Sequence, residues 1–345
     1  MSDSEVTMTR RCPICNGTGE LKYESVSDPT GAAEGEWDYL VCKSAPCGAL
    51  WLCPQPSASE LEKAYVGYFT HEAKQRKDGW LIRAFHYVRD GYYASRFGYA
   101  IGGSWAQSIM GNLLYLHPGW RADADFGLMY LSDQQEKELL EIGCGNGAAL
   151  GRLVRLGWVG CGMDTDPQAV AQARLSGLQV ECGTLEDLGY DAERFDVVII
   201  SHVLEHTGEP ENLLREIRRV LKKGGKVVCA TPNLLAFGHT LFRESWLNLD
   251  PPRHLILHNP NSLTRLLVET GYDISKLWTT CRYANGVWTA YWARKSGCVF
   301  EVGREGSVFR RITGRFVQLV EWVAICYWRM RGEDLCVVAQ RPIDS

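Results

Sequence analysis

The sequence predicts an α/β fold in which a parallel, doubly wound sheet carries helices on both of its faces. Two observations predict this fold. Across residues 138–278, short apolar runs of strand length alternate with amphipathic runs of helix length, as expected for parallel strands joined by crossover helices. Near the start of this region, a glycine-rich turn joins an apolar strand to a helix, as in nucleotide-binding sheets.

The elements of the sheet follow one another in regular order. Each expected strand is an apolar run, and each expected helix has apolar residues at helical spacing. Pro167 suits a first helical turn, and Gly157 and Gly177 suit helix ends. We expect strands at 138–144, 159–164, 178–183, 195–202, 226–233 and 332–342, and helices at 148–157, 167–177, 210–225 and 259–272, the last leading into a further strand.

The glycine-rich turn has the features of a nucleotide site. Gly143, Gly145 and Gly147 separate a strand from a helix, where a backbone without Cβ atoms turns sharply and approaches a ligand closely. The helix N-terminus adds free N–H groups. Asp164 ends the second strand, where a carboxylate can accept hydrogen bonds from both ribose hydroxyls. The loop lacks the Gly-x-Gly-x-x-Gly spacing of a dinucleotide site.

The loop spacing, Glu-x-Gly-x-Gly-x-Gly at 141–147, resembles motif I of the class I S-adenosylmethionine-dependent methyltransferases. Residues 159–174 are similar to their second strand and helix, 180–188 to the segment around the adenine, and 195–233 to motifs IV and V. The resemblance implies a Rossmann-like methyltransferase sheet, S-adenosylmethionine as cofactor, and a core like that of the ubiquinone-pathway enzymes.

The resemblance also assigns cofactor-binding residues by position. The glycine loop would surround the methionine moiety, the end of the second strand the ribose, the segment after the third strand the adenine, and the end of the fourth strand the sulfonium. In that order the residues are Glu141, Gly143, Cys144, Gly145, Asn146 and Gly147; Asp164 and Thr165; Thr184, Leu185 and Glu186; and Ser201 and His202.

A His-x-x-Glu-His pattern, His202, Glu205 and His206, follows the fourth strand. One class of zinc peptidases uses this pattern on a helix, but here it lies where a parallel strand leaves its sheet, which argues against a peptidase. Two interpretations remain, a packed turn and a metal site. In the resemblance, ubiquinone-pathway O-methyltransferases and a small-RNA 3′-end methyltransferase family bind a divalent cation with Glu-x-x-Glu-His here. With His202 replacing the first Glu, imidazole ligands would favour a transition metal over Mg²⁺.

Methyl transfer to a hydroxyl needs alignment and a base, and histidine titrates in the right range. Residues 246–263 resemble the substrate loop of small-molecule O-methyltransferases. His254 in this loop is the first candidate for the base, and His202 is the second. The alternative for His254 is a hydrogen bond within its own loop. We expect His258 to cap the next helix.

The N-terminal cysteines predict a structural zinc site. Cys12 and Cys15 form one close pair and Cys42 and Cys47 a second, on either side of a turn-rich stretch, which suits a tetrahedral Cys₄ site. The second pair is looser than the usual Cys-x-x-Cys, so Cys53 is an alternative ligand. Unliganded or redox-active thiols are the other interpretation. The arrangement resembles a subset of bacterial methyltransferases with an N-terminal zinc ribbon.

Composition divides the chain into segments. Residues 97–116 contain no charged side chain, but their glycines and polar residues make them weakly hydrophobic for a membrane span, so we expect a buried or lid-forming pair of helices. The expected segments are a zinc-ribbon-like segment at 10–57, an aromatic and basic helical cap at 58–135, the methyltransferase core at 136–278, a helical insertion at 279–331 and the final core strand at 332–345.

Overall composition narrows the class of protein. The chain has 345 residues, of which 46% are hydrophobic and 23% charged, as in soluble globular proteins. The net charge of −4 does not favour a nucleic-acid partner. The N-terminus shows no secretory signal, so the thirteen cysteines indicate a reducing cytoplasm. The aromatic, basic segments are where peripheral contact with the inner face of a membrane would occur.

These observations favour an S-adenosylmethionine-dependent methyltransferase that methylates a hydroxyl of a small molecule, glycan or lipid-linked intermediate. Aromatic side chains would stack on sugars or isoprenoid tails, and basic ones would meet phosphate. The alternatives are an RNA methyltransferase that grips its substrate with the zinc ribbon and a non-enzymatic binding module. The ribbon, with six acidic residues and one lysine across 16–41, argues against RNA. The glycine loop and Asp164 argue against a non-enzymatic module.

Overall fold

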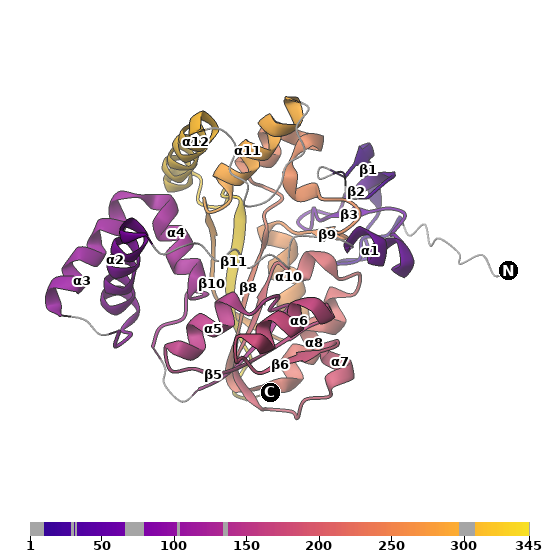
Figure 1. The fold of residues 1–345 in the computed structure, drawn as a ribbon. Coiled ribbons are helices and arrows are strands. Elements are labelled where there is room, and N and C mark those ends of the chain that lie inside the picture. The colour runs from indigo at the N-terminus through magenta and orange to yellow at the C-terminus, as the bar shows by residue number, and fades with distance from the viewer. Residues whose placement is uncertain are drawn as a thin grey trace.

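The computed structural model describes residues 10–28, 31, 33–65, 79–101, 104–133, 137–296 and 308–344 (Figure 1). Parts of the predicted cap, at 66–78, and of the predicted insertion, at 297–307, lie outside the described residues.

The predicted α/β fold is confirmed by a seven-stranded sheet with the strand order β10-β11-β8-β7-β4-β5-β6. Strands β4 to β8 pair in parallel, and β11 lies antiparallel between β8 and β10. The strands are β4 (Glu138–Ile142), β5 (Val159–Asp164), β6 (Val180–Cys182), β7 (Phe195–Ser201), β8 (Leu221–Pro232), β10 (Asp273–Thr280) and β11 (Asp334–Gln340).

The two faces of the sheet are buried in separate cores, because neighbouring residues of a strand point to opposite faces. Leu140 and Val198 belong to the core under α8 and α10, whereas Leu139 and Val197 belong to the core under α5. The helices are α5 (Ala148–Arg155), α6 (Pro167–Leu175), α7 (Leu185–Leu188), α8 (Pro210–Val220) and α10 (Pro260–Glu269).

The largest difference from the predicted boundaries lies between α8 and β8. The helix expected at 210–225 ends at Val220, and β8 begins at once because Leu221 already pairs with Phe195 of β7. Amphipathic spacing continued to Leu221, but pairing with the neighbouring strand replaces the helical hydrogen bonds there.

The N-terminal segment forms a second, four-stranded sheet in the order β1-β2-β3-β9. Three strands come from the ribbon, but β9 comes from within the predicted core and pairs with β3 through Leu50–Leu257 and Trp51–Ile256. The two segments are therefore joined by backbone hydrogen bonds. The strands are β1 (Gly19–Ser27), β2 (Glu36–Cys42), β3 (Leu50–Leu52) and β9 (Ile256–Leu257).

Helices outside the sheet gather above and beside the carboxyl ends of its strands (Figure 1). The uncharged segment at 97–116 was expected to form a buried or lid-forming pair of helices. It forms α3 and the 3₁₀ helix η2, a short pair that packs on α2 where Gly91 and Gly111 let two backbones approach closely. The pair is largely exposed, with Trp105 78% and Leu116 79% exposed. These helices are α1 (Ala58–Tyr65), α2 (Trp80–Phe97), α3 (Trp105–Gly111), the 3₁₀ helix η2 (Asn112–Leu116), α4 (Pro118–Gly127), α9 (Phe237–Phe242), α11 (Ala284–Lys295) and α12 (Val308–Tyr327).

Across the described part of the chain, none of the helices combines the length and the apolar composition that a bilayer crossing requires.

Candidate functional site

The glycine loop lies between β4 and α5, and its three glycines all adopt positive φ angles. The values are +67° for Gly143, +54° for Gly145 and +74° for Gly147. A Cβ on Gly143 would lie 2.5 Å from the Val203 side chain and one on Gly147 would lie 2.4 Å from Leu178, whereas one on Gly145 would meet nothing within 4 Å. Two glycines therefore serve close packing, and Gly145 faces open space that a ligand can fill.

Asp164, at the end of β5, holds the glycine loop in place. Its Oδ2 accepts a hydrogen bond from the Gly145 N–H at 2.8 Å, and its Oδ1 accepts one from the Asp166 N–H at 2.9 Å. A carboxylate oxygen has two lone-pair directions, so each oxygen retains one for a ribose hydroxyl. The geometry of Asp164 fits its predicted role.

The other predicted contacts around the methionine moiety are mostly buried. Glu141 is 4% exposed and its Oε2 has no hydrogen-bond partner among the described residues. Burial raises the pKa of Glu141 to about 8. Cys144 is buried, Asn146 accepts a hydrogen bond from the Ala148 N–H, and Thr165 is exposed. The orphaned carboxyl oxygen of Glu141 is the feature in this group that suits a polar ligand atom.

The predicted adenine segment starts α7. Thr184 caps this helix, because its hydroxyl accepts from the Asp187 N–H at 3.2 Å and donates to the Asp187 carboxylate at 2.7 Å. Leu185 is 1% exposed and belongs to the hydrophobic core. Glu186 is exposed.

His202 follows Ser201, the last residue of β7, and has a φ of +53°, which an ordinary L-residue rarely adopts. Its Nδ1 lies 3.1 Å from Oε1 of Glu205, while its Nε2 is buried without a hydrogen-bond partner in the described structure. Burial alone would lower the pKa of His202, but the hydrogen bond and charge of Glu205, together with the charge of Asp334, raise it above its ordinary value.

Polar atoms without partners gather around Nε2 of His202. Oδ1 of Asp334 lies 3.9 Å from this nitrogen, and Oδ2 of Asp334 lies 3.6 Å from Nη1 of Arg282. Both Asp334 oxygens and this Arg282 nitrogen are buried without a hydrogen bond within the described residues. The rings of Phe126 and Tyr283 flank the group, at 6.2 and 5.3 Å from the His202 ring. This arrangement suits a small polar group of a ligand.

Glu205 is fully buried beside these atoms. Its Oε2 accepts a hydrogen bond from the Thr231 hydroxyl at 3.0 Å. Burial would raise the pKa of Glu205, but the hydrogen bond from His202 and the charges of His202, His206 and His254 lower it to about 2. Glu205 is therefore an ionised carboxylate at neutral pH, so Nδ1 of His202 carries the proton of their hydrogen bond.

Residues 121–277, which contain the glycine loop, Asp164 and the His202 cluster, match the family described as "Methyltransferase domain". This chain carries a class I S-adenosylmethionine-dependent methyltransferase domain. The match covers a little less than half of the chain, and the geometry of Gly145, Asp164 and Glu141 within it fits the cofactor of that class.

Curated relatives of the methyltransferase domain are named as ubiquinone biosynthesis O-methyltransferases. One from Cereibacter sphaeroides is 42% identical over 105 residues, which are 29% of this chain and 42% of that protein. One from Coxiella burnetii is 28% identical over 115 residues, which are 31% of this chain and 49% of that protein. The chain spans less than half the length of these relatives.

Two solved structures resemble the chain at low identity. One is a chain from the complex between the Haloferax volcanii Trm112 methyltransferase activator and a methyltransferase, with 18% identity and a TM-score of 0.46, covering 74% of this chain and 97% of that one. The other is an S-adenosylmethionine-dependent methyltransferase from Mesorhizobium loti, also with 18% identity and a TM-score of 0.46, covering 64% and 98%.

The methyltransferase domain also contains a possible metal-binding group, Glu205, His206 and His254, whose ligand atoms all lie within 4.8 Å of one another. Nδ1 of His254 must donate to the Asn248 carbonyl at 2.7 Å, and its Nε2 lies 3.9 Å from Oδ2 of Asp250. His254 is 7% exposed. The alternative interpretation of His254, a hydrogen bond within its own loop, is therefore confirmed. The sequence analysis did not predict that His254 would lie beside Glu205 and His206.

The prediction that His258 caps the following helix is wrong. Asn259 is the N-cap of α10, with its side-chain oxygen accepting from the N–H groups of Asn261 and Ser262. His258 is fully buried one residue earlier, and neither ring nitrogen has a partner in the described structure. The short side chain of asparagine reaches both backbone N–H groups from the N-cap position, where it is among the preferred residues.

The loop that carries His254 is fixed by a buried ion cluster. Arg253 is 0% exposed and binds Asp28 of the ribbon at 2.7 and 3.1 Å, Asp250 of its own loop at 3.0 Å, and the Ala64 carbonyl of α1 at 3.2 Å. Three segments that are distant in sequence meet at this one guanidinium.

The four predicted cysteine ligands meet in one cluster. The Sγ atoms of Cys12, Cys15, Cys42 and Cys47 lie within 4.8 Å of one another, with Cys12–Cys47 at 3.7 Å and Cys15–Cys42 at 3.4 Å. Tetrahedral zinc with Zn–S bonds of about 2.3 Å needs sulfur atoms about 3.8 Å apart, so the geometry fits zinc. Cys53 is not part of this cluster, so the alternative that it replaces a ligand is not supported.

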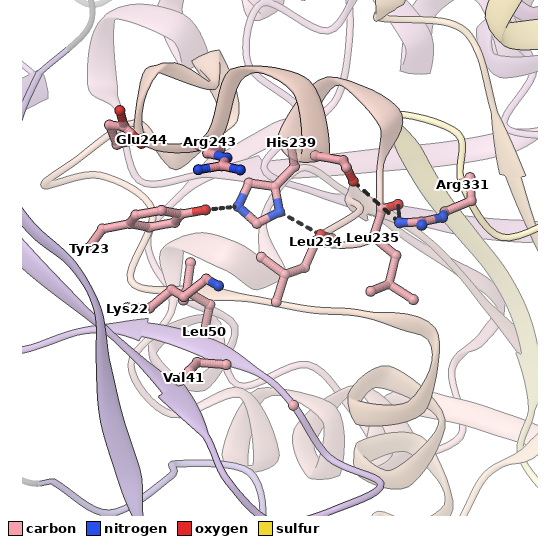
Figure 2. Close-up of a pocket in the computed structure, with 12 residues that line it drawn as sticks. Lys22, Tyr23, Val41, Leu50, Leu234, Leu235, His239, Arg243, Glu244 and Arg331 are labelled. Atoms are coloured by element: carbon pink, nitrogen blue, oxygen red, sulfur yellow. Dashed lines mark hydrogen bonds between the residues drawn. The ribbon is translucent and has the colours of Figure 1, made fainter.

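A pocket of about 710 Å³ opens between the small sheet and the segment after β8 (Figure 2). His239 stands at its wall, with Nδ1 2.7 Å from the Leu234 carbonyl. That nitrogen must donate, so Nε2 accepts from the Tyr23 hydroxyl at 2.9 Å. Lys22, Arg243 and Arg331 add positive charge to the lining. None of the predicted cofactor residues lines this pocket.

Proposed function

We propose that the chain transfers a methyl group from S-adenosylmethionine to a hydroxyl of a small-molecule, glycan or lipid-linked acceptor, with His202 as the general base. The observation that carries this proposal is the orientation of His202. Its Nδ1–H is held by ionised Glu205, which leaves the lone pair of Nε2 beside a buried group of polar atoms that lack hydrogen bonds.

The chemistry follows from this orientation. The cofactor supplies a methyl group that is already activated as a sulfonium. Nε2 of His202 accepts the hydroxyl proton as the acceptor oxygen becomes nucleophilic, and the Glu205 carboxylate stabilises the imidazolium that forms. Thr231 holds Glu205 through its second oxygen, so the base keeps its tautomer and ring orientation.

The neighbours of His202 define a place for the acceptor. Asp334 and Arg282 offer its hydroxyl groups polar atoms that lack hydrogen bonds. The rings of Phe126 and Tyr283, over which the Arg282 guanidinium lies at 3.4 and 4.3 Å, add an apolar border. A polar ring, such as a sugar or a hydroxylated aromatic, presents both kinds of surface. The named activity of the curated relatives, O-methylation, supports oxygen as the methylated atom.

His202 replaces His254 as the favoured base. Nδ1 of His254 donates to a carbonyl in its own loop, and the His254 ring packs 4.7 Å from the His206 ring. A second candidate mechanism is supported by the cluster of Glu205, His206 and His254, whose donor set fits a transition-metal ion. Such an ion would supply Lewis-acid polarisation of the acceptor oxygen.

We propose that the Cys₄ cluster binds one structural Zn²⁺. Four protein ligands fill a tetrahedral site, so no position is open for a substrate or water. In this proposal zinc holds the small sheet together, which has few strands and a small core. Atomic emission should find about one zinc per chain, and a variant with Cys15→Ser and Cys42→Ser should lose it.

Binding and turnover separate these proposals. Calorimetry with S-adenosylhomocysteine should show binding that Asp164→Ala abolishes. Asp166→Ala is the matched control, because Asp166 caps α6 in the same loop without a predicted cofactor contact. Absence of binding in the unaltered protein would refute the enzyme assignment.

Tritiated S-adenosylmethionine and a panel of hydroxylated aromatics and sugars would then identify an acceptor. With that acceptor, His202→Gln should lose turnover by about 10²–10⁴-fold with unchanged S-adenosylhomocysteine affinity. Equal turnover in His202→Gln and the unaltered protein would remove His202 as the base. Loss of activity in EDTA that Zn²⁺ or Mn²⁺ restores would favour the metal mechanism instead.

A further inference from the structure

Helix α12 presents an apolar side to solvent and a polar side to the protein, the reverse of an ordinary surface helix. Its buried positions include Gln318 at 1% and Glu321 at 5% exposure. Its outward positions recur at helical spacing and are 44–79% exposed. They are Phe309, Ile312, Phe316, Leu319, Val320, Val323 and Tyr327.

Hydrogen bonds on the inner side fix this orientation. Nε2 of Gln318 donates to the carbonyls of Cys281 and Arg282 at 3.1 and 2.9 Å. Oε1 of Glu321 accepts from the Glu333 N–H at 3.0 Å. Rotating the helix to bury its apolar side would break these buried hydrogen bonds, which is costly because a buried polar group without a partner loses its hydration and gains nothing in return. The exposed apolar side is therefore a stable property of the fold.

An apolar side of this size requires a partner other than water. The charges around it indicate which partner. Residues 308–331 contain five arginines and one acidic residue, Glu321, and that glutamate is buried. Tyr327 and Trp328 stand at the C-terminal end of the apolar side, followed by Arg329. Aromatic side chains at a polar boundary, with arginines and no exposed acid within residues 308–331, match a helix that lies in the interface of an anionic membrane.

We propose that α12 docks the protein on an anionic lipid surface, with its apolar side in the headgroup region and its axis in the membrane plane. This surface is separate from the cofactor loop, and binding to it does not depend on methyl transfer. The inner side of α12 holds the carbonyl of Arg282, a residue of the group around His202. If the proposed function holds, this helix places that group next to the lipid surface, where a lipid-linked acceptor would be presented.

Vesicle flotation tests the docking surface with the full chain. The probes are vesicles of phosphatidylcholine and vesicles in which about a third of the lipid is phosphatidylglycerol, at low and high salt. The test variant is Phe316→Ser with Val320→Ser. The matched control is Leu175→Ser with Val268→Ser, which removes two exposed apolar side chains from α6 and α10.

The unaltered protein and the Leu175/Val268 variant should float with the anionic vesicles, and the Phe316/Val320 variant should bind at least about tenfold more weakly. S-adenosylhomocysteine binding by every variant shows that each is folded and reports separately on the proposed function. The proposal is overturned if the unaltered protein does not bind anionic vesicles, if it binds neutral vesicles equally well, or if both variants lose binding equally. A dimer detected by light scattering and dissolved by Phe316→Ser with Val320→Ser would instead make this side a contact between two copies.

Discussion

Replacing Arg253 with methionine should destabilise the junction between the small sheet and the methyltransferase domain more than any surface change. The methionine fills much of the same volume but leaves two buried carboxylates, Asp28 and Asp250, without their cation, and the Ala64 carbonyl without one donor. Removing one partner of a buried pair costs about 3–5 kcal/mol, and here one cation serves two acids. We therefore expect a loss of at least about 4 kcal/mol in the free energy of unfolding.

Urea unfolding followed by circular dichroism measures this loss, and hydrogen exchange of the β3 amides locates it. Arg265→Met is the matched control, because Arg265 forms an exposed pair with Glu269 on α10, and losing an exposed pair should change the free energy of unfolding far less. Asp28→Asn added to Arg253→Met should restore part of the loss, since one unpaired charge is then removed. Equal losses in Arg253→Met and Arg265→Met would refute the view that the buried cluster joins the two parts.

Three further predictions concern titration and metal. Glu205→Gln removes the group that raises the pKa of His202, so the rise of kcat with pH should move to lower pH; an unmoved profile would separate His202 from the base. Glu141 has a folded pKa of about 8 against an ordinary 4.5, so folding favours its protonated form. The contribution of this group to the free energy of unfolding is complete below about pH 4.5 and is lost as the pH rises towards 8. In urea titrations, Glu141→Gln should therefore reduce the fall in stability between pH 4.5 and 7 by about 3 kcal/mol. The same pH dependence in both proteins would contradict the argument that burial raises the pKa of Glu141. Removing zinc with a chelator should expose β1–β3 to protease before the large sheet, whereas simultaneous cleavage of both would contradict a local role for the cysteines.

Local sequence signals were sufficient for the large sheet and the cofactor loop. Alternating apolar runs, the glycines at 143–147 and the acid at the end of β5 each depend on neighbours within a few residues. The cluster of four cysteines could also be predicted, because the ligands of a Cys₄ site usually occur as two pairs with short spacing within each pair. The predicted cap of α10 was wrong by one residue. His258 and Asn259 are adjacent in the sequence, and the N-cap is Asn259.

The group of residues around His202 could not be predicted from local sequence in the same way. Asp334 reaches His202 because β11 enters between β8 and β10 and pairs Asp334 with Pro232, next to the end of β7. No local pattern reports where a final strand inserts. Arg282 and Phe126 likewise come from separate segments. For α12, spacing indicated a helix but the usual rule would have buried its apolar side, and only the partners of Gln318 show that the polar side faces inward.

Strand β9 pairs with β3 across the boundary that composition places between the ribbon and the core, so cutting the chain at that boundary would separate paired strands. A fragment that began at residue 136 would retain the large sheet, the glycine loop and Asp164. It would lack β3, which pairs with Leu257, and Asp28, which binds Arg253. Such a fragment should hold the cofactor while the loop between Asp250 and Leu257 loses its anchors. The N-terminal ribbon therefore supports the loop between Asp250 and Leu257. Exchanging ribbons between related chains would also change the support of that loop.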